Sequence, residues 1–188
     1  MRRTYLMMIR KLGIFAVVAA LAVGCNPAPE DVDTGGSANS TEANADQAKE
    51  ESKKEKAADE KRFKAGVSKE FLGVQVGIGE VVIQRDRIQV GLNYENKSGQ
   101  AIHWYPDQEA KAVIGDMQLD SNLFMDDTGL TVGNISNGVK SDGVFTLRPS
   151  GKKTIDPKTV KEIKFSFGEM SSEDFMKDAK VEFTIPVK

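Results

Sequence analysis

Between Phe71 and Lys188, apolar residues recur at every second position, and this alternation constrains the fold more than any other feature of the chain. The clearest run is Arg87 to Glu95, RIQVGLNYE, and the same period returns in Glu162 to Phe167 and in Lys180 to Val187. Successive side chains of a β-strand point to opposite faces, so each run predicts a strand with one buried and one wet face. The carboxyl-terminal 118 residues therefore predict a single antiparallel domain.

Val74, Val76 and Ile78 predict the start of another strand, and glycine at positions 77 and 79 precedes its second part, Val81 to Ile83. Glycine at that spacing inside a strand predicts a β-bulge. Clusters of Asn, Asp, Gly and Pro separate the runs as turns, and Ser171 to Asp178 predicts one helical turn before the last strand. About seven short strands without long helical patterns favour an all-β fold, an antiparallel β-sandwich.

The first 24 residues have the layout of a secretory signal peptide. A basic head with Arg2, Arg3, Arg10 and Lys11 precedes the apolar run Leu12 to Gly24, LGIFAVVAALAVG. That run of 13 residues is too short for a bilayer core, which takes about 20 helical residues. Export from the cytoplasm follows from this order of segments.

The end of the run, Ala22-Val23-Gly24-Cys25, resembles the lipobox of bacterial lipoprotein precursors. The resemblance implies that the Gly24–Cys25 bond is cleaved and that Cys25 becomes a lipidated N-terminus. The alternative is a chance cysteine beside an ordinary signal-peptidase site. As the only cysteine, Cys25 can form no internal disulfide, so an anchoring role accounts for it. The expected location is the cell membrane, lipid-anchored and facing outside the cytoplasm.

Residues 25–70 are predicted to form the lipidated N-terminus and a tether. Residues 26–45 are rich in Pro, Asp, Gly, Ser, Thr and Asn, and such a segment buries too little apolar surface to offset its ordering entropy. From Asp46 the composition changes to Ala, Glu and Lys, which favours either a partly helical spacer or plain disorder.

The charge balance argues against nucleic acid as a partner. The full chain has 26 basic and 28 acidic residues, and the signal accounts for four of the basic ones. The remaining 22 basic and 28 acidic residues leave about six net negative charges, and no segment is strongly basic.

A family resemblance covers Phe71 to about Pro186. The runs NYENKSGQAIHWYPDQEAKAVIGDMQLDSNLF and GNISNGVKSDGVFTL resemble the immunoglobulin-like domain of unknown function found in many Gram-positive surface lipoproteins. That fold is shared with a mycobacterial secreted immunoprotective antigen. The best marks are Asn-x-Ser-Gly at Asn96 to Gly99 and Gly-Val-Lys-x-x-Gly at Gly138 to Gly143. The resemblance implies an immunoglobulin-like β-sandwich and brings no catalytic residues or cofactor.

Few residues suggest chemistry. His103 is the only histidine, and in a strand it shares a face with Tyr105 while Trp104 turns to the core. Gly77-Ile78-Gly79 lacks the third glycine and the following helix of a dinucleotide loop. The acidic segment from Asp116 to Asp127 holds four aspartates without the ladder of a dedicated calcium loop: Asp116, Asp120, Asp126 and Asp127. Solvated turns account for them equally well.

Two functions stay open. The first is a surface-displayed, non-enzymatic binding module whose partner is cell-wall polymer, another envelope protein or a host protein. The second is a calcium- or small-ligand-binding envelope lipoprotein that uses the segment Asp116 to Asp127. No enzymatic activity and no cofactor are expected.

Overall fold

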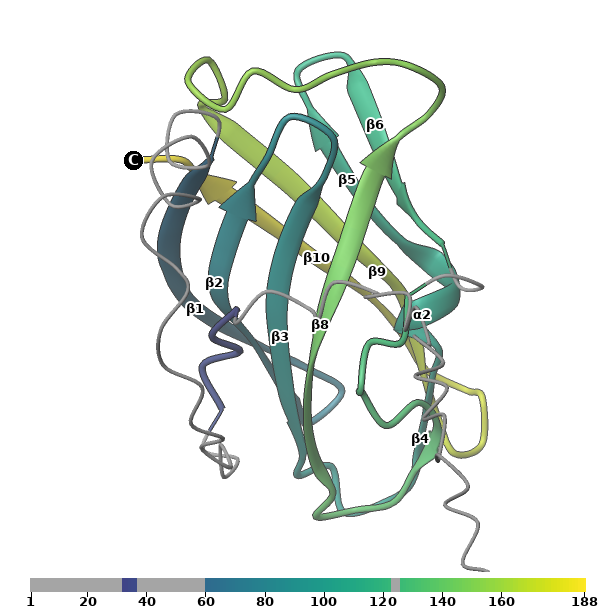
Figure 1. Cartoon of the computed structure of the whole chain (residues 1–188). Coiled ribbons are helices and arrows are strands. Elements are labelled where there is room, and N and C mark those ends of the chain that lie inside the picture. Colours follow the sequence, from purple (N-terminus) through teal and green to yellow (C-terminus); the bar gives the residue numbers. More distant parts are fainter. Residues whose placement is uncertain (1–31, 37–59, 123–125) are drawn as a thin grey trace, which may run out of the picture. The chain divides into compact units, whose positions relative to one another are not determined.

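The computed structural model describes residues 32–36, 60–122 and 126–188, and within them it is almost entirely antiparallel β-sheet (Figure 1). The elements are β1 (Lys61–Phe71), β2 (Val74–Ile83), β3 (Ile88–Asn96), β4 (Ile102–Trp104), α2 (Pro106–Glu109), β5 (Ala110–Ile114), β6 (Met117–Ser121), β7 (Gly133–Ile135), β8 (Lys140–Pro149), β9 (Glu162–Ser172) and β10 (Asp178–Pro186). The described residues contain no helix long and apolar enough to cross a membrane.

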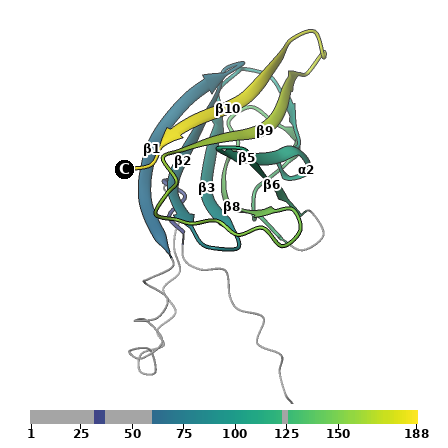
Figure 2. The same ribbon diagram turned by 90° about the horizontal axis from the view of Figure 1, so that it is seen from above.

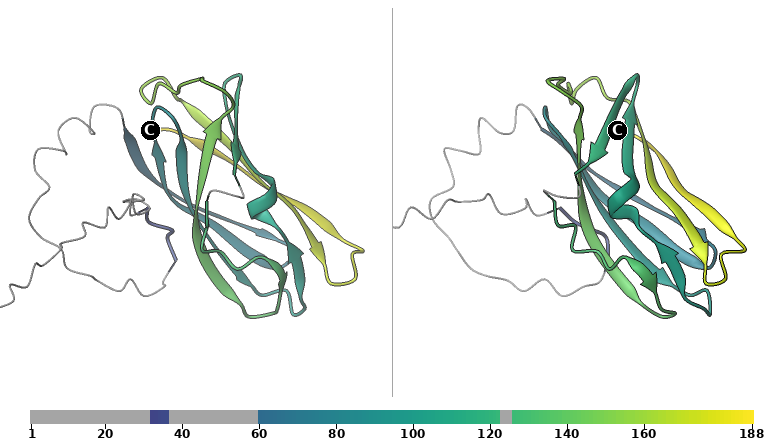
Figure 3. Two further views of the ribbon diagram at one scale, coloured as in Figure 1. Left: turned by 45° about the vertical axis from the view of Figure 1, so that its right-hand side comes forward. Right: turned by 90° about the vertical axis from the view of Figure 1, so that its right-hand side faces the viewer.

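The strands hydrogen-bond in the order β1-β2-β3-β8-β6-β5-β9-β4-β7, and β10 pairs with the other edge of β9. Strand β8 makes the turn between layers, because it pairs with β3 over most of its length and with β6 only at its end. The sheet thereby folds back on itself, so that β1, β2, β3 and β8 face β10, β9, β5 and β6 (Figures 2 and 3). The predicted all-β, sandwich-like fold is confirmed.

The core between the layers is built from the inward residues of the alternating runs. Phe145 on β8 meets Phe167 on β9 edge to face, with ring centroids 5.2 Å apart, and Phe183 on β10 continues the cluster. Trp104 is fully buried against Tyr94, and its Nε1–H donates to the Phe167 carbonyl at 2.8 Å. Such aromatic clusters bury much apolar surface, which stabilises the sandwich.

The runs predicted as strands do form β2, β3, β9 and β10, and the β2–β3 register shifts between Ile78 and Val81, which confirms the predicted bulge. The helical turn predicted at Ser171 to Asp178 is wrong. A tight loop joins β9 to β10 there, closed by the Lys177 carbonyl, which accepts from the Ser172 N–H at 2.8 Å. Antiparallel pairing of β9 with β10 on both sides of the loop holds its two ends extended.

The tether was predicted to reach residue 70, but β1 begins at Lys61 and pairs with β2 along its length. Phe63, Ala65 and Val67 alternate along β1 and pack against the core, while Arg62 and Lys64 lie on the outer face. This alternation is obscured in the sequence because it continues an Ala/Glu/Lys-rich stretch without a break. Residues 32–36, also assigned to the tether, have a defined place on the sheet.

Candidate functional site

The outer face of β2 and β3 carries glycine where most strands carry side chains. Gly91 lies in the middle of β3, and two residues of β2, Gly79 and Glu80, oppose it at the bulge. Gly77 pairs with Asn93 one step further along. We call Gly77, Gly79 and Gly91 the glycine platform. It is a patch of bare backbone that allows another segment to approach closely.

A segment of the chain's own N-terminal region, residues 32–36, covers the glycine platform. A methyl group on Gly91 would lie 2.7 Å from the Thr34 Cα atom, and a methyl group on either Gly79 or Gly91 would collide with the Asp33 carbonyl oxygen. Both colliding groups are backbone atoms, which cannot rotate away as a side chain can. The docked segment therefore requires glycine at both positions.

The β2 bulge provides the first anchor for the segment. A bulge leaves one residue outside the ladder, and here the Glu80 N–H donates to the Asp33 carbonyl at 2.7 Å. The Asp33 N–H donates in turn to Glu80 Oε2 at 3.2 Å. Glu80 is 9% exposed, so this reciprocal pair lies largely out of solvent, where hydrogen bonds count for most.

The second anchor is Thr34, which reaches from β3 to β8. Asn93 Nδ2–H donates to the Thr34 carbonyl at 2.5 Å, and the Thr34 hydroxyl donates to Asp142 Oδ2 at 2.8 Å. Asn93 and Asp142 are register partners in the β3–β8 ladder, so their side chains lie side by side. Recognition of Thr34 thus combines a backbone carbonyl with a hydroxyl.

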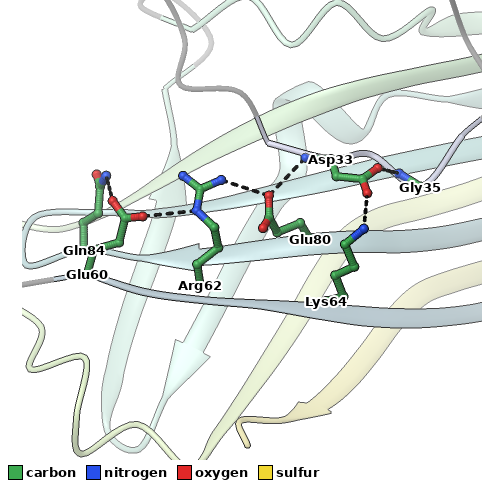
Figure 4. Close-up of polar contacts among 7 residues, drawn as sticks. All are labelled: Asp33, Gly35, Glu60, Arg62, Lys64, Glu80 and Gln84. Atoms are coloured by element: carbon green, nitrogen blue, oxygen red, sulfur yellow. Dashed lines mark hydrogen bonds and ion pairs between the residues drawn. The ribbon is translucent and has the colours of Figure 1, made fainter. Parts of the chain in front are cut away.

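Charged side chains from β1 and β2 border the platform and continue the contacts (Figure 4). Lys64 Nζ lies 2.9 Å from Asp33 Oδ2, and Arg62 Nη1 lies 2.9 Å from Glu80 Oε2. Arg62 also pairs with Glu60 at 3.2 Å. Glu80, which accepts from the Asp33 N–H, is itself paired with the Arg62 guanidinium.

These contacts shift the pKa of the exposed pair in opposite directions. The hydrogen bond from Lys64, together with the Gly35 N–H, lowers the pKa of Asp33 below 3.8. The hydrogen bond to Asp33 raises the pKa of Lys64. Both groups are charged near neutral pH, and their exposure makes the pair a weak, salt-sensitive contact.

Cys25 and Gly24, the predicted lipid attachment and cleavage residues, lie outside the described residues. His103 and Trp104 fall on opposite faces of β4, as predicted from the alternation. The His103 ring stacks on Phe175 with centroids 4.3 Å apart, and Tyr105 is 47% exposed. His103 therefore packs beside the β9–β10 loop.

The four aspartates of the acidic segment go to different places. Asp126 forms an ion pair with Arg148, Asp120 accepts from Gln118, and Asp127 accepts from the Gly129 N–H. Within residues 32–36, 60–122 and 126–188, no group of three His, Cys, Asp or Glu side chains is placed to hold a metal ion.

Asp116 lies in the β5–β6 turn and lines a hollow of about 590 Å³. The loop before β9 also lines the hollow, through Ile155, Asp156 and Val160. The hollow mixes apolar side chains with charges of both signs, since Lys161, Glu162 and Lys164 also line it.

The glycine spacing in the sequence predicts the bulge but not the glycine platform as a docking surface. Gly77 and Gly79 indicate the bulge, and Gly91 falls on the predicted wet face of the run Arg87 to Glu95. Glycine at several outward positions of adjacent strands indicates a site of close backbone approach. The covering segment, Asp33 to Gly36, lies within a stretch whose composition gives no sign of it.

Comparison with known proteins gives likenesses of structure only, since no protein-family model and no curated protein sequence matches the chain. Two similar structures have 13% identity and a TM-score of 0.44: Bacillus subtilis ycdA, described as a lipoprotein, and a functionally unknown protein of Listeria monocytogenes. The first covers 65% of this chain and the second 69%. The likeness spans 39% of ycdA and 89% of the Listeria protein. The GAE domain of Saccharomyces cerevisiae GGA2p has 12% identity and a TM-score of 0.35, over 65% of this chain and 98% of that domain.

Proposed function

We propose that the chain is a lipid-anchored extracytoplasmic lipoprotein whose β-sandwich is a non-enzymatic binding module for extended peptide segments. The anchor is supported by the order of basic head, short apolar run and Ala22-Val23-Gly24-Cys25. Acyl chains contribute about 0.8 kcal/mol per buried methylene, and two chains hold a protein at a membrane far longer than one. An immunoglobulin-like relationship is supported by the Asn96 to Gly99 turn.

The observation that carries the binding function is the segment docked on the glycine platform. Asp33 and Thr34 are held through their backbone groups and through one short side chain each. Because Gly79 and Gly91 leave no room between the segment and the sheet, a ligand must present bare backbone there. The partner class that fits is a protein with an exposed extended segment, rather than a wall polysaccharide, which has no amide backbone to match.

Gln89 is a buried polar residue near the start of β3, close to the glycine platform. It lies two residues before Gly91 on the same face and is 5% exposed, and its Oε1 accepts no hydrogen bond among the described residues. Buried acceptors are costly when unpaired.

A peptide titration tests the binding function. In the chain from residue 26, residues 33–36 are replaced by serine to empty the site, and a peptide of residues 31–37, DVDTGGS, is added. Short linkers give effective concentrations of about millimolar, so a segment that docks in cis should bind in trans with a Kd below about 1 mM. The amide resonances of Gly79, Glu80 and Gly91 should shift on titration.

Two controls make the titration specific. Adding Gly91→Ala to the emptied chain should abolish the shifts, while a peptide with Asp and Thr exchanged should bind more weakly. Peptide binding that survives Gly91→Ala, or no binding by the emptied chain, would remove the peptide-binding function. The anchor is tested separately: Cys25→Ser should abolish incorporation of labelled palmitate by the expressed protein.

A further inference from the structure

We propose that the docked segment is a latch that sets how far the β-sandwich can stand from the membrane. The inference rests on the lipid anchor at Cys25 proposed above and adds regulation to the same peptide site. What carries it is the position of the latch in the chain. The contacts with the glycine platform are made by residues 33–36, far closer to Cys25 than the first strand is.

The two states differ in the number of residues between anchor and domain. With the segment docked, eight peptide steps connect Cys25 to Asp33, and they span at most about 29 Å. With the segment released, 35 peptide steps connect Cys25 to Glu60, and they span at most about 126 Å.

The latch can open without unfolding the domain. The apolar core cluster and the side chains packed against it come from Phe63 onward, so release of residues 33–36 removes none of it. Residues 33–36 are held by hydrogen bonds and one ion pair on the outer face, and the adjacent Val32 is buried at 6% exposed but lies outside the core cluster. The side chains of that pair, Asp33 and Lys64, are 48% and 76% exposed. Water can replace this exposed ion pair at little cost, so the closed state depends mainly on the hydrogen bonds to Glu80, Asn93 and Asp142.

Ligand binding and reach are coupled because one site serves both. A partner peptide on Gly79 and Gly91 occupies the space of the Asp33 and Thr34 backbone, so the bound and latched states exclude each other. Such coupling is reciprocal. A partner that occupies the platform releases the latch and so lengthens the connection to the membrane. The factor by which a closed latch weakens partner binding equals the factor by which the partner weakens docking of the latch.

A spin label at Cys25 tests the latch directly, since Cys25 is the only cysteine of the chain. The chain beginning at Cys25 carries a nitroxide on that thiol, and paramagnetic broadening is measured at the backbone amides. We expect broadening centred on β2, β3 and β8 around the platform. Gly91→Ala should remove it from these strands, and so should excess DVDTGGS peptide.

The serine replacement of residues 33–36 provides the matched background. In that background Gly91→Ala should cause no further change in the broadening, since the added methyl group meets nothing docked. Broadening that is weak around the platform in the unaltered chain, or that Gly91→Ala leaves in place, overturns the latch.

Membrane distance is measured with the same chain coupled through Cys25 to a maleimide lipid in a supported bilayer. Neutron reflectometry should place the domain closer to the bilayer in the unaltered chain than in Gly91→Ala. Equal distances overturn the control of reach. Both measurements use a Cys25 thiol that has not been lipidated, so they test the latch independently of the palmitate experiment. A failure of the palmitate experiment would contradict the lipid anchor but not the docking of the segment.

Discussion

Two segments of this molecule cross a strand at glycine, and they use the same local chemistry. Residues 33–36 cross β2 and β3 at Gly79 and Gly91, and residues 128–130 cross β8 at Gly143. In each case the crossing carbonyl accepts a strand N–H: Asp33 from Glu80 at 2.7 Å and Thr128 from Val144 at 3.0 Å.

The two segments differ in how their ends are held. Residues 128–130 are tied on both sides, because Asp126 pairs with Arg148 and Thr131 accepts from the Tyr94 hydroxyl at 2.8 Å. Leu130, between them, belongs to the core. The Asp33 segment contributes no side chain to that core cluster, and 47 residues separate Asp33 from Glu80. The crossing by residues 128–130 is thus part of the fold, whereas the crossing by residues 33–36 is the one that we propose as a binding site.

Gly143→Ala should give the largest loss of stability, because Gly143 lies under residues 128–130, which form part of the fold. The new methyl group would collide with the Thr128 carbonyl and lie 3.0 Å from the Leu130 nitrogen, and Leu130 cannot move without opening the core. Overpacking of this kind costs about 2 kcal/mol, which lowers the Tm by roughly 4–8 °C. Calorimetry measures it.

The control for that variant is Gly77→Ala. Its methyl group would meet the Asn93 side chain, with Oδ1 at 2.8 Å, and a side-chain amide can rotate. It should therefore cost less than Gly143→Ala. If Gly143→Ala had the Tm of the unaltered chain, residues 128–130 would be able to leave β8 without unfolding the domain, as we propose for residues 33–36.

Asp126→Asn should have the next largest effect, since it loosens one end of the tied segment. The Asp126 and Arg148 side chains are 17% and 33% exposed, so the pair lies between a surface and a buried salt bridge. We expect a loss of about 1 kcal/mol in unfolding free energy, measured by urea denaturation. Asp127→Asn is the matched neighbour, and it should change the unfolding free energy by less than about 0.5 kcal/mol.

Gly91→Ala should lower the global stability less than either of these, and its effect should appear locally. The core keeps all its contacts, but the Glu80 amide loses its acceptor on Asp33. Hydrogen exchange at Glu80 should accelerate by roughly tenfold for each ~1.4 kcal/mol of docking free energy lost. If Gly91→Ala lowered the Tm as much as Gly143→Ala does, both crossings would be equally part of the fold, and the distinction between them would be wrong.

The strands and the bulge were predictable because alternation and glycine position are local properties of the sequence. Trp104 could be assigned to the core because its neighbours fixed the face on which it lies. The docked segment could not be predicted, because Asp33 and Thr34 are recognised through backbone groups that every residue carries. Their partners Glu80, Asn93 and Asp142 come together only through the register of three strands.

The start of β1 was missed for a related reason. Phe63, Ala65 and Val67 alternate, but composition upstream of them is that of a charged spacer. Only pairing with β2 shows that Arg62 and Lys64 occupy the outer face and that the small residue Ala65 faces inward. Local composition described this boundary less well than periodicity alone would have done.

The smallest expected effect is the pH dependence of docking, and its sign follows from the Asp33–Lys64 contact. The hydrogen bond from Lys64, with the Gly35 N–H, lowers the pKa of Asp33 below the 3.8 of a free aspartate. A carboxyl group whose pKa is lowered in the docked state stabilises docking above pH 3.8, and that contribution is lost as the pH falls through the lowered value.

Docking should therefore be constant from neutral pH down to about 4 and weaken only below it. Glu80, Asp142, Lys64 and Arg62 also face the segment. Asp33→Asn isolates the Asp33 part: broadening from the Cys25 label should then be weaker at pH 7 and flatter between pH 5 and 3. An unchanged pH profile in Asp33→Asn would show that the acid sensitivity of docking does not come from Asp33. The latch would then be held by its backbone contacts and Thr34 rather than by its one exposed ion pair.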